Sequence, residues 1–154
     1  MKPALPRANP AYAPHIADIP TVFVVERDVG HRSAMAQGLR ADGMNVIEFA
    51  RSAEALAAVS DGGRPAILVI TPEGDGLPDH ELACRARAAA PRTDIVFTRS
   101  PSGAPPPGSH VLARPFTPGR LSRFIRLVVA KPALRSTLQG LYRQAHATSP
   151  RPVA

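Results

Sequence analysis

Residues 65–71 of the chain read PAILVIT, and this stretch decides the fold class. It holds five consecutive apolar residues, from Ala66 to Ile70. A strand with one face in water alternates apolar and polar residues, whereas a strand covered on both faces is apolar throughout. Strands covered on both faces belong almost only to parallel sheets with helices on each side. We therefore predict a central parallel strand over residues 66–70.

The sequence on either side repeats an alternation of strand and helix. Further strands are predicted over residues 21–25, 44–49, 94–98 and 110–113. The 44–49 strand is mixed in polarity, which favours a place at the edge of the sheet. Helices are predicted over residues 31–42, from residue 52, over residues 78–90 and from residue 117, with Gly43 as the left-handed end of the first. This alternation predicts an α/β fold with a five-stranded parallel sheet.

One helix is missing from the alternation. Residues 100–109, between the fourth and fifth strands, read SPSGAPPPGS. A segment with four prolines and two glycines cannot form a stable helix. We expect a Pro/Gly loop in place of the helix between strands 4 and 5. Loss of that helix is expected to uncover apolar surface near Val96 and Val111.

The two ends of the chain differ from the middle. Residues 1–20 contain five prolines and no hydrophobic periodicity, which predicts a Pro-rich disordered arm. Residues 21–130 form the predicted domain. Residues 131–154 are predicted to form an extra C-terminal amphipathic helix and a tail, the apolar positions being Leu134, Leu138, Leu141 and Tyr142. A short helix is marginal in water, so we expect this stripe to pack on a surface of the same chain or of a second subunit.

Composition excludes several classes of protein. The 154 residues are 44% hydrophobic, typical of a globular domain. No apolar run approaches the ~20 residues of a membrane helix, and the first residues lack the apolar stretch of a signal peptide. We expect a cytoplasmic protein with no membrane contact. Cys84 cannot form a disulfide framework alone, and the five histidines are too scattered to predict a metal site.

The net charge of +7 is unevenly distributed. Residues 1–94 hold ten Lys/Arg and twelve Asp/Glu, whereas residues 95–154 hold nine Lys/Arg and no acid. A basic segment of this kind predicts an acidic partner, or else a solvated arginine-rich surface.

The chain contains TVFVVE at 21–26, FARSAEAL at 49–56 and RPF at 114–116. Together these three segments resemble the receiver domain of bacterial two-component response regulators. The resemblance spans about residues 20–130 and implies a flavodoxin-like sheet with a pocket at the carboxyl ends of its strands. It also implies a cis peptide bond between Arg114 and Pro115.

The resemblance further implies five pocket positions, of which three are altered. Receivers place two metal-binding acids after the first strand, and here these positions hold Glu26 and Arg27. The phosphate-accepting aspartate is replaced by Thr71, which cannot form an acyl phosphate. Thr98 keeps the hydroxyl position, and Arg114 replaces a lysine. We expect Arg27 to oppose the metal charge, and Arg27 and Arg114 to pair with Glu26 or Asp75.

These features predict a stand-alone pseudoreceiver that acts through protein–protein interaction, with no enzymatic activity and no cofactor. Its expected partner is a histidine kinase or another regulator, and a homodimer is a further possibility. An alternative is a small nucleic-acid-binding regulator that uses the acid-free half, including Arg120, Arg123 and Arg126. A second alternative, in which Glu73 or Asp75 serves as a displaced phosphate acceptor, is disfavoured by Arg27.

Overall fold

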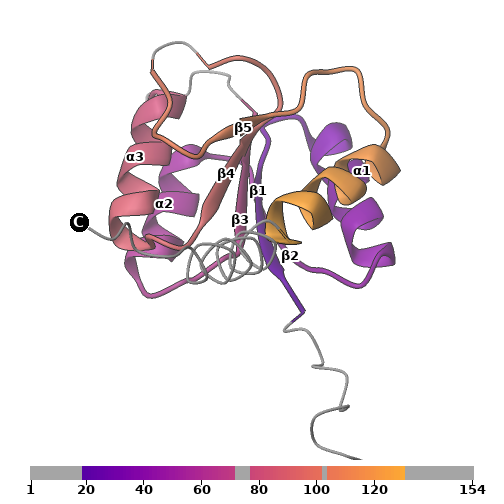
Figure 1. Cartoon of the computed structure of the whole chain (residues 1–154), viewed down its shortest axis with the longest axis horizontal. Coiled ribbons are helices and arrows are strands. Elements are labelled where there is room, and N and C mark those ends of the chain that lie inside the picture. Colours follow the sequence, from indigo (N-terminus) through magenta and orange to yellow (C-terminus); the bar gives the residue numbers. More distant parts are fainter. Residues whose placement is uncertain (1–18, 72–76, 102–103, 131–154) are drawn as a thin grey trace, which may run out of the picture.

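The chain is known from a computed structural model that describes residues 19–71, 77–101 and 104–130. A five-stranded parallel sheet lies between two layers of helices (Figure 1). A further helix covers residues 118–130. The other elements, in chain order, are β1 (Thr21–Val25), α1 (Val29–Ala41), β2 (Asn45–Phe49), α2 (Ser52–Ser60), β3 (Ile67–Ile70), α3 (Asp79–Ala89), β4 (Asp94–Phe97) and β5 (His110–Val111).

The strand order is β2-β1-β3-β4-β5, and every neighbouring pair is parallel. The predictions of a central third strand and an edge second strand are both confirmed. All four residues of β3 are buried, because helices cover both of its faces. This order places β1, β3 and β4 side by side, so the residues that follow these strands meet at one edge of the sheet.

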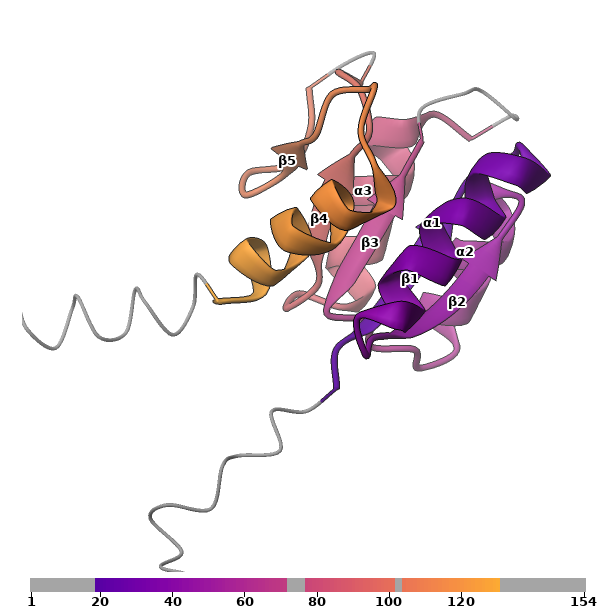
Figure 2. The same cartoon turned by 90° about the vertical axis from the view of Figure 1, so that its right-hand side faces the viewer.

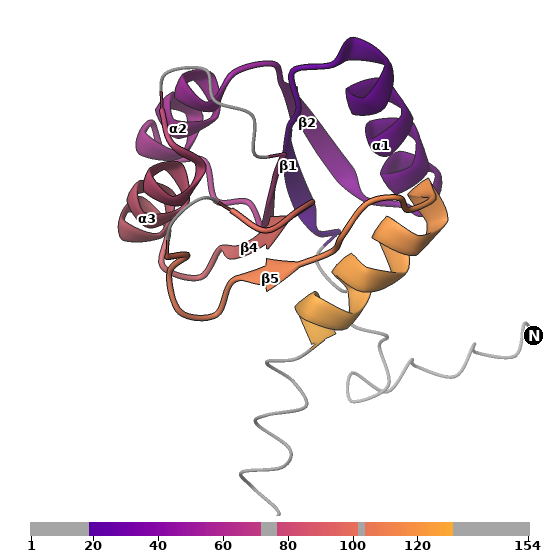
Figure 3. The same cartoon turned by 90° about the horizontal axis from the view of Figure 1, so that it is seen from above.

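The core consists of two layers because successive strand residues point to opposite faces. On one face, alternate residues of β1, β3 and β4, such as Val24, Val69 and Val96, pack with α1 and the 118–130 helix. On the other, Phe23, Leu68 and their neighbours pack with α2 and α3. Figure 3 shows the two helix pairs on opposite sides of the sheet, and Figure 2 shows α1 beside the 118–130 helix.

Local signals explain both ends of α1. The Asp28 carboxylate accepts a hydrogen bond from the His31 N–H at 2.7 Å and caps the helix, which begins at Val29, two residues before the predicted start. Gly43 has a φ of 84°, so the prediction of a left-handed residue after this helix is confirmed.

Between β4 and β5 the described residues contain no helix, as predicted. The loop is attached to α3 by the Arg87 guanidinium, which donates to the Pro107 carbonyl. Val111 is 44% exposed, as expected from the loss of a helix. Val96 is fully buried, so that part of the prediction was wrong. It points to the opposite face of the sheet, where the 118–130 helix covers it.

Several predictions lie outside the described residues. These concern the arm up to residue 18, the acids Glu73 and Asp75, and the C-terminal stripe of Leu134, Leu138, Leu141 and Tyr142. Among the residues that are described, no helix has both the length and the apolar character needed to cross a bilayer.

Candidate functional site

Four of the five predicted pocket residues meet at the carboxyl edge of the sheet. Glu26, Thr71 and Thr98 directly follow β1, β3 and β4, and Arg114 lies three residues after β5. Backbone bonds extend the strand pairing into this edge, because Thr71 N–H donates to Val25 at 3.0 Å and Thr98 N–H donates to Ile70 at 3.0 Å. The sheet itself therefore sets the spacing of these side chains.

Arg114 connects the members of this cluster. One guanidinium nitrogen, Nη2, donates to Glu26 Oε2 and to Thr71 Oγ1, the latter at 3.2 Å. The Thr98 hydroxyl donates to Thr71 Oγ1 at 3.0 Å. The other terminal nitrogen, Nη1, lies 3.3 Å from His31 Nδ1, which must accept because a guanidinium only donates. We call Glu26, Thr71, Thr98 and Arg114 the arginine-filled pocket.

Burial strengthens these interactions. Glu26 is 2% exposed and Thr98 is fully buried, whereas the Arg114 side chain is 33% exposed. The second carboxylate oxygen, Glu26 Oε1, accepts the Asp28 N–H at 2.9 Å. Both carboxylate oxygens are therefore satisfied by donors of the chain itself, as a buried charge requires.

Arg27 does not join the pocket. Its side chain is exposed and makes no hydrogen bond or ion pair with any residue that the structure describes, although its backbone carbonyl accepts a hydrogen bond from Arg32 Nη1 at 3.4 Å. The expectation that its charge occupies the pocket is therefore corrected, because the side chain at this position leaves the sheet edge for solvent. Its proposed partner Asp75 is outside the described residues.

Sequence reasoning missed the arginine that does support this edge. Arg32 Nη1 donates to the backbone carbonyl of Glu26 at 2.8 Å, and its Nε lies 3.8 Å from a carboxylate oxygen of Glu48. Arg32 lies three residues into α1 from Val29, on the helix turn that faces the end of β1. Nothing in the spacing of Arg32 from Glu26 along the sequence predicts this contact.

Asp28 is a second residue that the sequence reasoning left out. The hydrogen bond from the His31 N–H holds the pKa of Asp28 below its ordinary value. Its position immediately before a helix was the available signal, since Asp is a preferred N-cap. Within the described ranges, no three His, Cys, Asp or Glu side chains are grouped closely enough to hold a metal ion.

The pocket chemistry is that of a neutralised site. Thr71 accepts two hydrogen bonds, from Arg114 and from Thr98, and neither donor is a base that could activate a hydroxyl. The Arg114–Pro115 peptide is cis, as the resemblance implied. A cavity of about 340 Å³ lies next to Arg114, between α1 and the start of the 118–130 helix.

The predicted interaction arginines lie on the 118–130 helix. Arg120 and Arg123 are exposed, and their side chains have no polar partner among the residues the structure describes. Arg126 instead donates to the backbone carbonyl of Asp42 at 2.8 Å and ties the helix to the end of α1. Leu127, on the same helix, is 67% exposed.

Comparison with known proteins identifies the fold. No family model matches the sequence, and no curated protein matches it. The structure is similar to the chemotaxis protein CheY4 of Vibrio cholerae, with a TM-score of 0.62 and 19% identity over 71% of this chain and 98% of that chain. It is also similar to the receiver domain of the hybrid histidine kinase CckA, with a TM-score of 0.63 and 24% identity over 71% and 98% of the two chains.

A third similar structure is a response regulator receiver protein from Sinorhizobium medicae, with a TM-score of 0.65 and 19% identity over 73% of this chain and 96% of that chain. The class is therefore clear at the level of fold. This chain has the flavodoxin-like receiver fold of response regulators, and the part of the loop between β4 and β5 that the structure describes contains no helix.

Proposed function

We propose that this chain is a receiver-fold module of two-component signalling that works by binding a protein partner and is not phosphorylated. The observation that carries the proposal is the Arg114 guanidinium at Thr71, where a receiver would hold its phosphate acceptor. The Arg114 guanidinium already occupies the place where a phosphoryl group and its metal ion would bind, and its hydrogen bonds to Glu26 and Thr71 hold it there. The module is not an enzyme and needs no cofactor in this proposal.

The residues of the pocket support this function for a chemical reason. Phosphoryl transfer to a receiver needs a carboxylate nucleophile, and Thr71 supplies only a hydroxyl whose oxygen already accepts two hydrogen bonds. Glu26 is the buried acid of the pocket, and its charge is paired with Arg114. The arginine-filled pocket therefore serves to stabilise one conformation of the sheet edge.

The first prediction tests the absence of phosphorylation. Incubation of the full chain with acetyl phosphate and Mg²⁺ should leave its intact mass unchanged, because the nucleophile position holds Thr71. Thr71→Asp alone should also remain unmodified, since Arg27 still replaces a metal ligand. The double variant Arg27→Asp with Thr71→Asp restores both acids and is the arm in which uptake is expected.

A receiver domain with an aspartate at the acceptor position serves as the positive control in the same mass measurement. A gain of one phosphate by the unmodified chain, mapped to Glu73 or Asp75, would contradict the proposal in favour of a displaced acceptor.

The 118–130 helix supports a specific binding surface. Its exposed Arg123 and Arg120 lie one and two turns before the exposed Leu127, on the same side of the helix. We call Arg120, Arg123 and Leu127 the arginine–leucine surface. Cationic side chains beside an exposed leucine favour a protein partner with an acidic, partly apolar face, such as a histidine kinase or another regulator.

The second prediction concerns this surface. Arg120→Glu with Arg123→Glu should weaken binding of the partner about tenfold or more, because two favourable charge contacts become repulsive. Arg51→Glu with Arg92→Glu changes the net charge equally at exposed positions elsewhere and is the matched control. Partners captured from cells of origin by each variant are quantified after a wash in 0.3 M salt, where the screening length is about 5–6 Å.

The second candidate function is nucleic-acid binding, which the acid-free residues 95–130 favour. It predicts binding to any sufficiently long duplex, with an affinity that falls steeply as salt increases. A partner that is retained at 0.3 M salt and lost only in the Arg120/Arg123 variant supports the protein-binding proposal. Duplex binding with a steep salt dependence and no retained protein would replace it with the alternative.

A further inference from the structure

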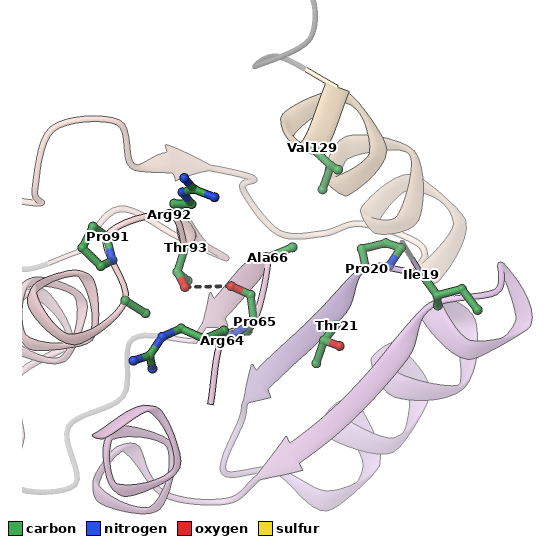
Figure 4. Close-up of a pocket in the computed structure, with 11 residues that line it drawn as sticks. Ile19, Pro20, Thr21, Arg64, Pro65, Ala66, Pro91, Arg92, Thr93 and Val129 are labelled. Carbon is green, nitrogen blue, oxygen red and sulfur yellow. Dashed lines mark hydrogen bonds between the residues drawn. The ribbon is translucent and has the colours of Figure 1, made fainter. Parts of the chain in front are cut away.

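A cavity of about 810 Å³ lies at the opposite end of the sheet from the arginine-filled pocket. Its walls include Thr21, Ala66 and Thr93, which lie at or just before the first residues of β1, β3 and β4. Val129 of the 118–130 helix closes one side (Figure 4). A strand of five residues is about 16 Å long, so this cavity and the pocket are separate sites.

The wall is suited to an apolar occupant. Pro20, Pro65 and Pro91 contribute to it and have no N–H to offer. The Thr93 hydroxyl is already bonded to the Pro65 carbonyl at 2.7 Å. Ala66 N–H donates to the Thr21 carbonyl at 2.8 Å, so the backbone here is also satisfied. A small polar ligand would find few partners among these groups.

The apolar side chains of the rim are incompletely covered. Ile19 is 53% exposed and Val129 is 37% exposed. In Figure 4, Val129 points from its helix toward Ala66, with Pro91 to one side and Pro20 to the other. Covering these groups with another apolar surface would remove them from water, which stabilises by about 25 cal/mol for each Å² buried.

The nearest source of such a surface is the chain itself. Ala130 follows Val129 directly, and residues 131–145 read KPALRSTLQGLYRQA, with Leu134 and Leu138 as the first members of the predicted stripe. Four residues of extended chain reach at most about 14 Å, which is enough to bring Leu134 back to the cavity. A tethered segment also has an effective concentration in the millimolar range, which favours it over a second copy.

Charge favours the same occupant. α1, α2 and α3 run opposite to the strands, so their carbonyl ends gather at this end of the sheet and carry partial negative charge. Residues 131–145 contain Lys131, Arg135 and Arg143 and no acid. Arg126 already makes such a contact, since its guanidinium donates to the Asp42 carbonyl at the end of α1.

Arg64 and Arg92 also line the cavity and repel the basic segment. The partial negative charge of the helix ends must outweigh this repulsion. Arg64 Nη1 is held by the carbonyls of Val59 and Gly63, at 3.2 Å and 2.8 Å. Both arginines are exposed, so solvent screens their repulsion of the segment.

We propose that the cavity at the amino ends of β1, β3 and β4 is the docking site of the chain's own residues 131–145, which seat Leu134 and Leu138 against Ala66 and Val129. Docking there covers Val129 and leaves Leu127 uncovered, because these two residues are two positions apart and point to roughly opposite sides of the helix. The arginine–leucine surface then stays available to a partner, and the inference does not depend on the proposed function.

The test uses the full chain with labelled methyl groups. Nuclear Overhauser contacts are expected between the methyls of Leu134 or Leu138 and those of Ala66 or Val129. In an equal mixture of labelled and unlabelled protein, filtered spectra should show no contact between molecules. Absence of these contacts, or their presence only between molecules, would overturn the proposal, the second result indicating a second copy as the occupant.

A variant pair provides a second measurement. Leu134→Ser with Leu138→Ser should shift the backbone amide signals of Ile19, Ala66 and Thr93 and lower the Tm by about 5 °C. Ser136→Ala with Gln139→Ala changes the other side of the segment and should leave the amide signals and the Tm unchanged. Equal behaviour of the two double variants would also overturn the proposal.

Discussion

Arg114→Ala should lower the free energy of unfolding by about 2–3 kcal/mol, toward the range for breaking a buried ion pair. The reason lies in the burial of its partner. Glu26 is 2% exposed, so its Oε2 would lose a charged donor while remaining inside the protein. Thr71 would lose a donor as well. The arginine is one-third exposed, which is why the expected loss lies below the largest values seen for buried pairs.

Urea unfolding followed by circular dichroism measures this effect. Arg114→Lys keeps the positive charge but not the geometry that reaches Glu26 and Thr71 together, so it should lose about half as much. Arg27→Ala is the matched control, because that arginine is exposed and unpaired among the described residues; its stability should change by less than about 0.5 kcal/mol. If Arg114→Ala were as neutral as Arg27→Ala, the pocket would have no stabilising role.

A double-mutant cycle isolates the pair itself. Glu26→Gln removes the charge of the carboxylate, and combining it with Arg114→Ala should cost less than the sum of the two single changes. A coupling of about 1 kcal/mol or more is expected for groups in direct contact. Additive effects would assign the loss to packing of Arg114 over the Phe116 ring, whose centre lies 6.0 Å from the guanidinium carbon.

The fold was predictable because its strongest signal is local. The apolar run of Ile67–Ile70 required cover on both faces, and the prolines of residues 100–109 excluded a helix before β5. Both conclusions follow from properties of short segments, and the structure agrees with both. Polarity placed β3 at the centre and β2 at the edge, but the full order of the strands was not predicted, since nothing local in β2 specifies that it pairs with β1.

The contacts of the pocket were only partly predictable. That Glu26, Thr71, Thr98 and Arg114 meet follows from parallel strands ending together. That Arg32 reaches the Glu26 carbonyl depends on the rotation of α1 about its axis, whereas the exposure of Arg27 depends on the turn between β1 and α1. Rotation is set by packing of Met35 and Leu39 into the core, a long-range effect that spacing does not reveal. The prediction that Val96 is uncovered was wrong for a similar reason. In a strand that is apolar throughout, the sequence does not show which face of the sheet each residue occupies.

One packing contact fixes the position of the arginine–leucine surface on the domain. Gly38 of α1 faces Pro118 at the start of the 118–130 helix, and a Cβ added at Gly38 would lie 2.3 Å from Pro118 Cβ. Real carbon atoms do not approach so closely, so the two helices can meet here only because residue 38 has no side chain. The ring of Pro118 cannot turn away as a flexible side chain could.

Gly38→Ala should therefore lower the free energy of unfolding by about 2 kcal/mol, as overpacking typically does. The same change inside an unhindered helix would raise the free energy of unfolding by up to about 1 kcal/mol. The sign of the measured change therefore shows whether the Cβ of residue 38 clashes with Pro118. Gly119→Ala is the matched control, since the nearest atom to its added Cβ is Thr117 Oγ1 at 4.0 Å, and stability should stay equal or rise slightly. Pro118→Gly combined with Gly38→Ala removes the opposing Cβ and should recover part of the loss. Because Arg120 and Arg123 follow Pro118 on the displaced helix, Gly38→Ala should also weaken partner binding. An increase in the free energy of unfolding would instead show that this contact does not hold α1 and the 118–130 helix together.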